Sequence, residues 1–183
     1  MKSVLISIQP KWCELIASGK KTVEVRKTKP KLETPFKVYI YETQGRTETP
    51  WIDEDGHHIF KGRGQVIGEF VCDEITPLFN VATTSWNLLA GNVHEYAKAL
   101  VRMARLTEEE MHSYAKRKNC YAWHISDLVI YDKPRELSEF LIDCKCCSKK
   151  KIGDPNCWQG CVNGYRRITR APQSWCYVES EGE

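Results

Sequence analysis

The sequence lacks any apolar run long enough to cross a membrane. The N-terminus offers only Val4-Leu5-Ile6 followed by Ile8, whereas a spanning helix needs roughly 20 consecutive apolar residues. This stretch is also shorter than the apolar region of a signal peptide, and no small-residue cleavage site follows it. We therefore expect a soluble, cytoplasmic protein without a membrane partner.

Internal repeats and low-complexity tracts are also missing, and the composition excludes a disordered chain. Of the 183 residues, 10% are aromatic, including six Trp, whereas disordered chains are poor in aromatic residues. A chain of this length fits one globular domain, or one domain with an appendix.

Cysteine, in contrast, is abundant, but it does not suit a disulfide framework. There are nine cysteines, and an odd number without a secretion signal favours metal binding or catalysis. Six of them fall within residues 144–176: Cys144, Cys146, Cys147, Cys157, Cys161 and Cys176. The sequence therefore predicts two parts, a domain over residues 1–143 and a cysteine-rich tail over residues 144–183.

The spacing within the tail predicts a structural zinc site. Cys144 and Cys147 form one close pair, Cys157 and Cys161 form another, and a turn-rich segment joins them. Two such pairs suit a tetrahedral Zn²⁺ bound by four thiolates, as in a zinc knuckle. Cys146 could replace a neighbouring ligand, which leaves the exact set open.

Cys176 stands in the segment Ser174–Val178, which reads as a strand, and we expect it to be packed rather than metal-bound.

Acidic residues are scarce in the tail. The segment between Cys144 and Cys176 contains seven basic residues and a single acidic one, Asp154. It therefore carries a charge of +6, although the whole chain carries only +3. A basic segment on a near-neutral body favours a polyanionic partner.

The pattern of elements predicts a mixed α+β fold. Strands are expected over residues 4–8, 22–26, 36–43, 65–75, 120–125 and 128–131, and helices after Pro10, Asn92 and Thr107. Without the regular alternation of a parallel sheet, this order favours a curled antiparallel sheet or a small barrel with helices packed around it. Residues 45–64 read as a long polar loop, and Trp51 within it is a candidate for stacking on a base.

The segment from Gly19 to Arg26 is the strongest candidate for a functional site, because charged residues follow directly on a glycine turn. A glycine turn is followed by Lys21, and strand alternation places Glu24 and Arg26 on one face. There the carboxylate can orient a guanidinium that holds a phosphate or a base edge. A lysine beside a carboxylate can also act as a general base if its pKa is lowered. We do not expect the side chains of Lys21 and Arg26 to supply core volume, so replacing either of them with alanine should change stability little.

This segment resembles a known family. Ser7-Ile8-Gln9-Pro10, a short helix and then Gly-x-Lys-x-x-Glu-x-Arg are similar to the signature of ASCH domains, relatives of the PUA, EVE and YTH modules. Tyr121–Ile125, leading to Lys133-Pro134, resembles the closing strand of the family. The resemblance implies a small PUA-like β-barrel wrapped by helices. Its cleft, lined by Gly19, Lys21, Glu24 and Arg26, would accept RNA or a nucleobase.

The resemblance leaves the activity open. Many ASCH domains are inferred RNA binders, whereas some hydrolyse N4-acylated cytidine with a lysine, a threonine and a glutamate, and a ribonuclease activity has been proposed. Lys21 matches that lysine, but Glu24 stands at the threonine position, and the catalytic glutamate cannot be placed. We expect a binder of RNA or a modified nucleotide with a zinc-stabilised basic tail. The alternatives are a hydrolase that uses Lys21 and Glu24 in the same cleft, and a zinc-knuckle interaction module whose barrel has lost its ligand.

Overall fold

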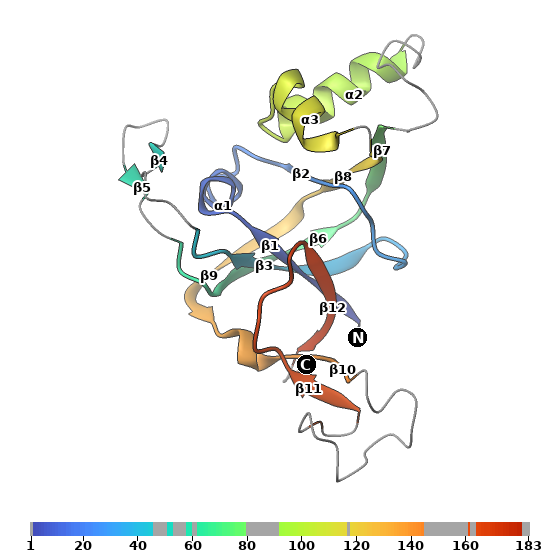
Figure 1. Ribbon diagram of the computed structural model, residues 1–183. Helices are drawn as coiled ribbons and strands as arrows, with labels where there is room; N and C mark the ends of the chain where they lie inside the picture. The colour runs from blue at the N-terminus through green and yellow to red at the C-terminus, as the bar shows by residue number, and fades with distance from the viewer. Residues whose placement is uncertain are drawn as a thin grey trace. The chain divides into compact units, whose positions relative to one another are not determined.

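The computed structural model describes residues 2–45, 51–52, 58–59, 62–79, 92–116, 118–144, 161 and 164–180 (Figure 1). The chain divides into two compact units. The first unit holds Met1–Cys13, Lys37–Glu69 and Val129–Glu183, and the second holds Glu14–Phe36 and Phe70–Leu128. No helix within the described ranges has the length and apolar character needed to span a membrane.

The helices are α1 (Pro10–Ala17), α2 (Asn92–Met103) and α3 (Glu108–Ala115), with a short 3₁₀ helix at Leu137–Glu139. The strands are β1 (Ser3–Ile8), β2 (Val23–Arg26), β3 (Phe36–Glu42), β4 (Trp51–Ile52), β5 (His58–Ile59), β6 (Val66–Cys72), β7 (Ile75–Phe79), β8 (Cys120–His124), β9 (Ser126–Arg135), β10 (Phe140–Asp143), β11 (Tyr165–Arg167) and β12 (Trp175–Ser180). The mixed α+β fold predicted from the sequence is confirmed.

The sheet of the first unit is built around β1. Its order is β11-β10-β12-β1-β3-β6-β9, and β6 and β9 both continue past the residues of this unit. Every residue of β1 is buried, as expected of a central strand with an aliphatic run. β1 is parallel to β3 and antiparallel to β12.

This order has two ends, β11 and β9, so the sheet is open along the described strands. The closed barrel expected from the sequence is therefore not formed by the part of the chain that the structure describes. The described residues form a large mixed sheet, a separate three-stranded sheet, a two-stranded sheet of β4 and β5, and three α-helices.

Part of the cysteine-rich segment belongs to the main sheet. β12 lies between β1 and β10, with Cys176 opposite Leu5. Cys176 is half-buried and contacts a core cluster that includes Leu5, Tyr39 and Val178. The expectation that Cys176 is a packed strand residue is confirmed. Residues 145–160 lie outside the described part of the chain.

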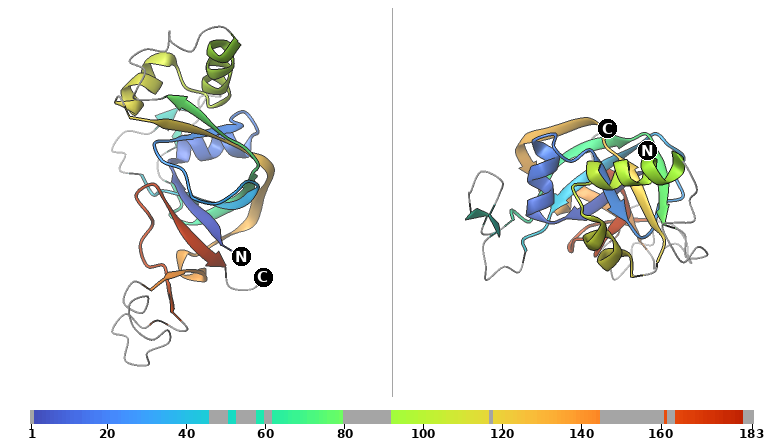
Figure 2. Two further views of the ribbon diagram at one scale, coloured as in Figure 1. Left: turned by 90° about the vertical axis from the view of Figure 1, so that its right-hand side faces the viewer. Right: turned by 90° about the horizontal axis from the view of Figure 1, so that it is seen from above.

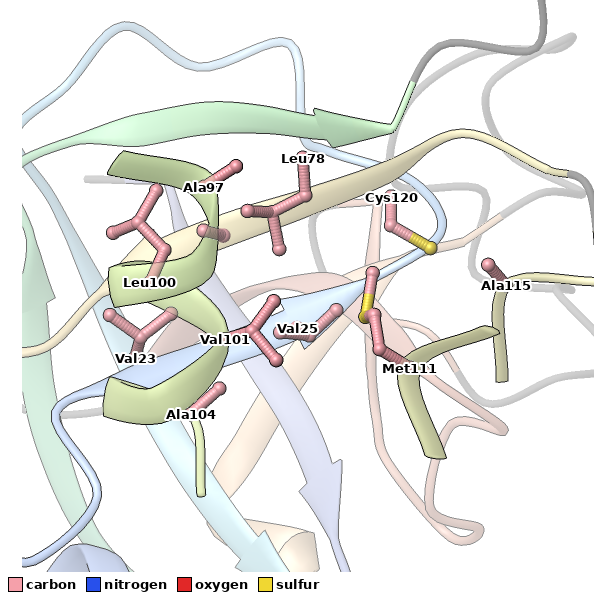
Figure 3. Close-up of a cluster of buried hydrophobic side chains, with 11 residues drawn as sticks. Val23, Val25, Leu78, Ala97, Leu100, Val101, Ala104, Met111, Ala115 and Cys120 are labelled. Atoms are coloured by element: carbon pink, nitrogen blue, oxygen red, sulfur yellow. The ribbon is translucent and has the colours of Figure 1, made fainter. Parts of the chain in front are cut away.

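The second unit is a three-stranded antiparallel sheet, in the order β2-β8-β7, with α2 and α3 on one face (Figures 1 and 2). Figure 3 shows the core between them, in which Val23 and Val25 of β2 meet Val101, Ala104 and Met111 of the helices. Ala97, Leu100 and Val101 of α2, together with Ala104 just beyond its end, are buried and recur at helical spacing.

A capping box fixes the start of α3, where the sequence predicted a helix after Thr107. Thr107 is the N-cap, and its side chain accepts a hydrogen bond from the backbone N–H of Glu110 at 3.1 Å. The Glu110 carboxylate accepts one from the backbone N–H of Thr107 at 2.8 Å. These two hydrogen bonds satisfy two backbone donors at this helix end.

Candidate nucleic-acid-binding site

The turn after α1 brings Lys21 to its place. Gly19 adopts φ +72°, a left-handed conformation typical of a glycine that ends a helix. Its backbone N–H donates to the carbonyl of Ile16, and the backbone N–H of Lys21 donates to that of Leu15. A Cβ built on Gly19 would meet nothing within 4 Å. The position thus favours glycine for its backbone angle rather than for lack of space.

Residues at the C-terminal end of α2 and just after it form hydrogen bonds with this turn. The backbone N–H of Thr22 donates to the carbonyl of Met103 at 3.2 Å. The Lys21 ammonium donates to the carbonyl of Ala104 at 2.7 Å. Arg105 donates from Nε to the carbonyl of Lys20, also at 2.7 Å. Residues 20–22 are therefore held, one by one, by residues 103–105.

Lys21, Glu24 and Arg26, which we call the charge cluster, are in mutual contact. Lys21 Nζ lies 3.3 Å from Glu24 Oε2, and a terminal nitrogen of Arg26 lies 3.2 Å from Glu24 Oε1. One carboxylate thus holds two cations, one on each oxygen. The three residues that the sequence singled out come together as expected.

The cluster is more buried than the sequence suggested. Lys21 is 3% exposed and Glu24 is 6% exposed, while the Arg26 side chain is 13% exposed. The expectation that the Lys21 side chain lies outside the core is therefore wrong, and we now expect replacing Lys21 or Glu24 to cost stability. Removing one partner of a buried ion pair leaves the other charge uncompensated.

Neighbouring strands fix the surroundings of the cluster. In the antiparallel pairing of β2 with β8, Glu24 lies opposite Trp123 and Arg26 lies opposite Tyr121. Trp123 is fully buried and packs edge-on against Phe36, with ring centroids 6.0 Å apart. Trp123 is consequently a core residue.

Burial also shifts the pKa values of two groups here. Desolvation lowers the pKa of Lys21 below its usual value, although the adjacent Glu24 carboxylate acts in the opposite direction. Desolvation raises the pKa of Tyr114, a residue of α3, and a hydrogen bond with Arg26 opposes that rise. Arg26 therefore contacts the helical layer as well as Glu24.

An open depression adjoins the cluster at Tyr114, and sequence reasoning did not find it. It has a volume of about 640 Å³ and is lined by Lys27, Glu109, Glu110, Ser113, Tyr114 and Lys116. Lys27 Nζ lies 4.7 Å from the centroid of the Tyr114 ring, within the range of a cation–π contact. Lys27 could have been noticed in the sequence, because it directly follows Arg26. The other residues that line the depression lie in or next to α3, far along the chain.

Two sets of predicted residues are described only in part. The backbone of Trp51 pairs with Ile59 in the β4–β5 hairpin, but its side chain lies outside what the structure describes. Cys144 is buried and Cys161 is half-buried, whereas Cys147 and Cys157 lie outside the described residues. Within the described ranges, no group of three or more potential metal ligands is found. The zinc site stays a prediction.

Comparison with known families identifies the larger part of the chain. A family model for the ASCH domain matches residues 6–135, which is well over half of the sequence. The chain belongs to the ASCH domain family. The match contains the whole charge cluster and ends before Cys144, so the four predicted zinc ligands lie outside it.

Solved structures show the same fold. A crystal structure of an ASCH protein from Zymomonas mobilis has a TM-score of 0.55 at 20% identity, covering 98% of this chain and 89% of that one. Its serine-to-alanine variant gives 0.55 at 19% identity, covering 97% and 88%. Its tyrosine-to-phenylalanine variant gives 0.54 at 20% identity, covering 98% and 91%. No curated protein matches the chain. ASCH domains are generally associated with binding RNA or nucleotides.

Proposed function

We propose that this ASCH domain binds RNA or a modified nucleotide through the charge cluster, with Arg26 as the group that contacts the ligand. The observation that carries this proposal is the shared carboxylate of Glu24, whose two oxygens hold Lys21 and Arg26 at 3.3 and 3.2 Å. A guanidinium oriented in this way is ready to donate to a phosphate or to the edge of a base.

The three residues then have different roles. Arg26 is the most exposed of them and stands at the end of β2. Lys21 is bound to the carbonyl of Ala104 and to Glu24 beneath it, and adds positive charge to the site. Glu24 positions both cations and does not itself need to touch an anionic ligand. A preorganised cation loses less entropy on binding than a mobile surface side chain.

Equilibrium binding of single-stranded RNA tests this proposal. Arg26→Ala should weaken binding by roughly 1 to 3 kcal/mol, the range for a charge-assisted contact. Arg63→Ala is the matched control, because Arg63 is exposed and lies 3.9 Å from the Glu42 carboxylate in a comparable ion pair. Equal affinity of the two variants would contradict the proposal.

A second candidate, hydrolysis of a nucleoside or RNA, is favoured by the lowered pKa of Lys21 beside Glu24. A buried amine of this kind can act as a general base. Lys21→Met keeps much of the bulk and removes the amine, so an enzyme should still bind N4-acetylcytidine or RNA but lose turnover. A binding module should show no turnover in the wild type either.

We also infer a zinc-stabilised basic segment around Cys144, Cys147, Cys157 and Cys161. The described residues that support it are at the ends of the segment: the backbone N–H of Cys144 donates to the carbonyl of Gly164 at 2.7 Å. Because β10 and β11 pair there, the two ends of the segment are brought close together. Such closure is what a four-thiolate site needs.

The contribution of this segment's positive charge to RNA binding can be tested without deleting the segment. A truncation after Asp143 would delete β12, which lies within the main sheet, so substitution is the cleaner change. If Lys149, Lys150 and Lys151 contact phosphates, replacing all three with glutamine should flatten the dependence of log affinity for RNA on log salt. An unchanged slope would show that these lysines do not contact RNA.

A further inference from the structure

The depression beside the charge cluster has a size and lining suited to a nucleotide. Its volume of about 640 Å³ falls within the range of roughly 300–1,000 Å³ that is usual for ligand sites. Its lining combines an aromatic ring, two lysines, a serine and two glutamates. None of these residues belongs to the charge cluster.

Tyr114 links the depression to the cluster. Lys27 lies over the ring of Tyr114 at 4.7 Å, and Arg26 forms a hydrogen bond with the side chain of the same tyrosine. Two consecutive cationic residues therefore contact Tyr114: Lys27 lies over its ring, and Arg26 lies at its hydroxyl group. A polyanion that reaches Arg26 is at once within reach of Lys27.

The lining separates into groups for phosphate and groups for a base. Lys27 and Lys116 can donate to phosphate oxygens. The Glu110 carboxylate accepts a hydrogen bond from the backbone N–H of Thr107, while Glu109, the preceding residue in the exposed first turn of α3, can accept from the amino group of a base. A carboxylate that accepts from an exocyclic amine is a known mode of base recognition.

A second lysine–aromatic pair lies beside Arg26. Lys29 Nζ lies 5.7 Å from the centroid of the Tyr121 ring, and Tyr121 is the residue opposite Arg26 in the β2–β8 pairing. Positive side chains interleaved with aromatic rings are typical of proteins that bind single-stranded nucleic acid.

From these contacts we propose that the depression is a second nucleotide subsite, which takes the nucleotide adjacent to the one held at Arg26. The ligand is accordingly a single-stranded RNA of at least two nucleotides rather than a free nucleoside. This inference rests on the proposed function and adds the class of ligand. A base must be unpaired to enter such a depression, because a duplex hides its recognition edges.

The test compares a long and a short probe on the full chain. The probes are a mixed-sequence single-stranded RNA of about ten nucleotides, a usual site size for single-strand binders, and cytidine monophosphate. Lys27→Ala should weaken RNA binding about five- to tenfold, as expected for the loss of one charged contact. Its log–log salt slope should become shallower by about 0.7. Binding of cytidine monophosphate should not change.

Lys11→Ala is the matched control. Lys11 Nζ lies 4.7 Å from the Trp12 ring centroid, so this variant removes one charge and one similar cation–π contact, and Lys11 does not line the depression. It should leave the binding of both probes unchanged. Lys116→Ala, at an exposed position, should repeat the effect of Lys27→Ala if the depression binds RNA.

The possible failures are distinguishable. If Lys27→Ala and Lys116→Ala behave as Lys11→Ala does while Arg26→Ala weakens both probes, the subsite is overturned and the proposed function stands. Equal loss of both probes in Lys27→Ala, or binding of cytidine monophosphate alone by the wild type, also overturns the subsite. If the wild type binds neither probe, the proposed function fails together with it.

Discussion

Glu24 determines the site at the scale of single residues, because its carboxylate compensates two cations at once. Lys21 and Arg26 are each paired to a different oxygen of this group. Without Glu24, the buried Lys21 ammonium would keep the carbonyl of Ala104 but lose its counter-charge. Glu24 therefore stabilises the cluster and sets the geometry through which we propose that the ligand binds.

Glu24→Gln should lower the free energy of unfolding by about 3–5 kcal/mol, since it leaves buried charge uncompensated. Urea unfolding measures this loss. Glu33→Gln is the control, because Glu33 is exposed and surface substitutions usually change stability by less than about 0.5 kcal/mol. A loss no larger in Glu24→Gln than in Glu33→Gln would mean that the cluster is not held as described.

Lys21 should make stability depend on pH in the alkaline range. Its pKa in the folded state is lowered below the unfolded value of 10.5. Between these two values the unfolded chain binds more protons, so the free energy of unfolding rises with pH. Lys21→Met removes this contribution. Urea unfolding at several pH values up to 10.5 should show a more positive slope for the wild type than for Lys21→Met, and identical slopes would contradict the lowered pKa.

The residue types of the site could be predicted from the sequence, but their burial could not. Gly19, Lys21, Glu24 and Arg26 are close in the chain, and a turn followed by a strand is a local pattern. The groups that bury them are distant: Ala104 lies 83 residues from Lys21. Lys27 and Tyr114 are similarly far apart in the chain, and no regular spacing in the sequence predicts their contact.

At the scale of elements, the contact between α2 and the turn after α1 positions the cluster. Arg105 adopts φ +55° just beyond α2 and donates to the carbonyl of Lys20. It does not belong to the cluster, so its effect on the ligand is through the turn.

Arg105→Ala should loosen residues 20–22 and speed hydrogen exchange at the amide of Thr22, which donates to Met103. The lost hydrogen bond corresponds to about 1 kcal/mol. Arg102→Ala removes an exposed arginine of the last turn of α2 and serves as the control. Equal exchange rates at Thr22 in the two variants would show that Arg105 does not hold the turn.

Short-range sequence patterns predicted individual helices and strands well, but they did not predict which distant strands pair. Pro10 and Gly19 bracket the first helix as expected, and the Thr107–Glu110 capping box is present. The position of β12 between β1 and β10 joins segments some 170 residues apart. Nothing in a strand's own residues specifies such a partner, since many registers bury the same apolar face.

At the scale of the whole molecule, seven of the nine cysteines fall into two classes. Burial raises the pKa of Cys72 to about 12 and those of Cys120 and Cys176 to about 11. These thiols stay protonated at neutral pH and react slowly, because the thiolate is the nucleophile. Cys144, Cys147, Cys157 and Cys161, in contrast, would be thiolates on zinc.

Metal analysis of protein purified without added metal should find about one zinc per chain. After chelation, iodoacetamide should modify these four cysteines, while Cys72, Cys120 and Cys176 stay protected. Mass spectrometry of the peptides distinguishes the two classes. Substoichiometric zinc, or equal modification of the four cysteines before and after chelation, would contradict the zinc site.

Photocrosslinking of bound single-stranded RNA, followed by peptide mapping, tests binding through the charge cluster directly, because it reports where on the molecule the ligand lies. We predict crosslinked peptides from residues 19–29 and from α3 around Tyr114, with loss of both in Arg26→Ala and retention in Arg63→Ala. Crosslinks confined to residues 144–183, and unchanged in Arg26→Ala, would contradict binding through the charge cluster.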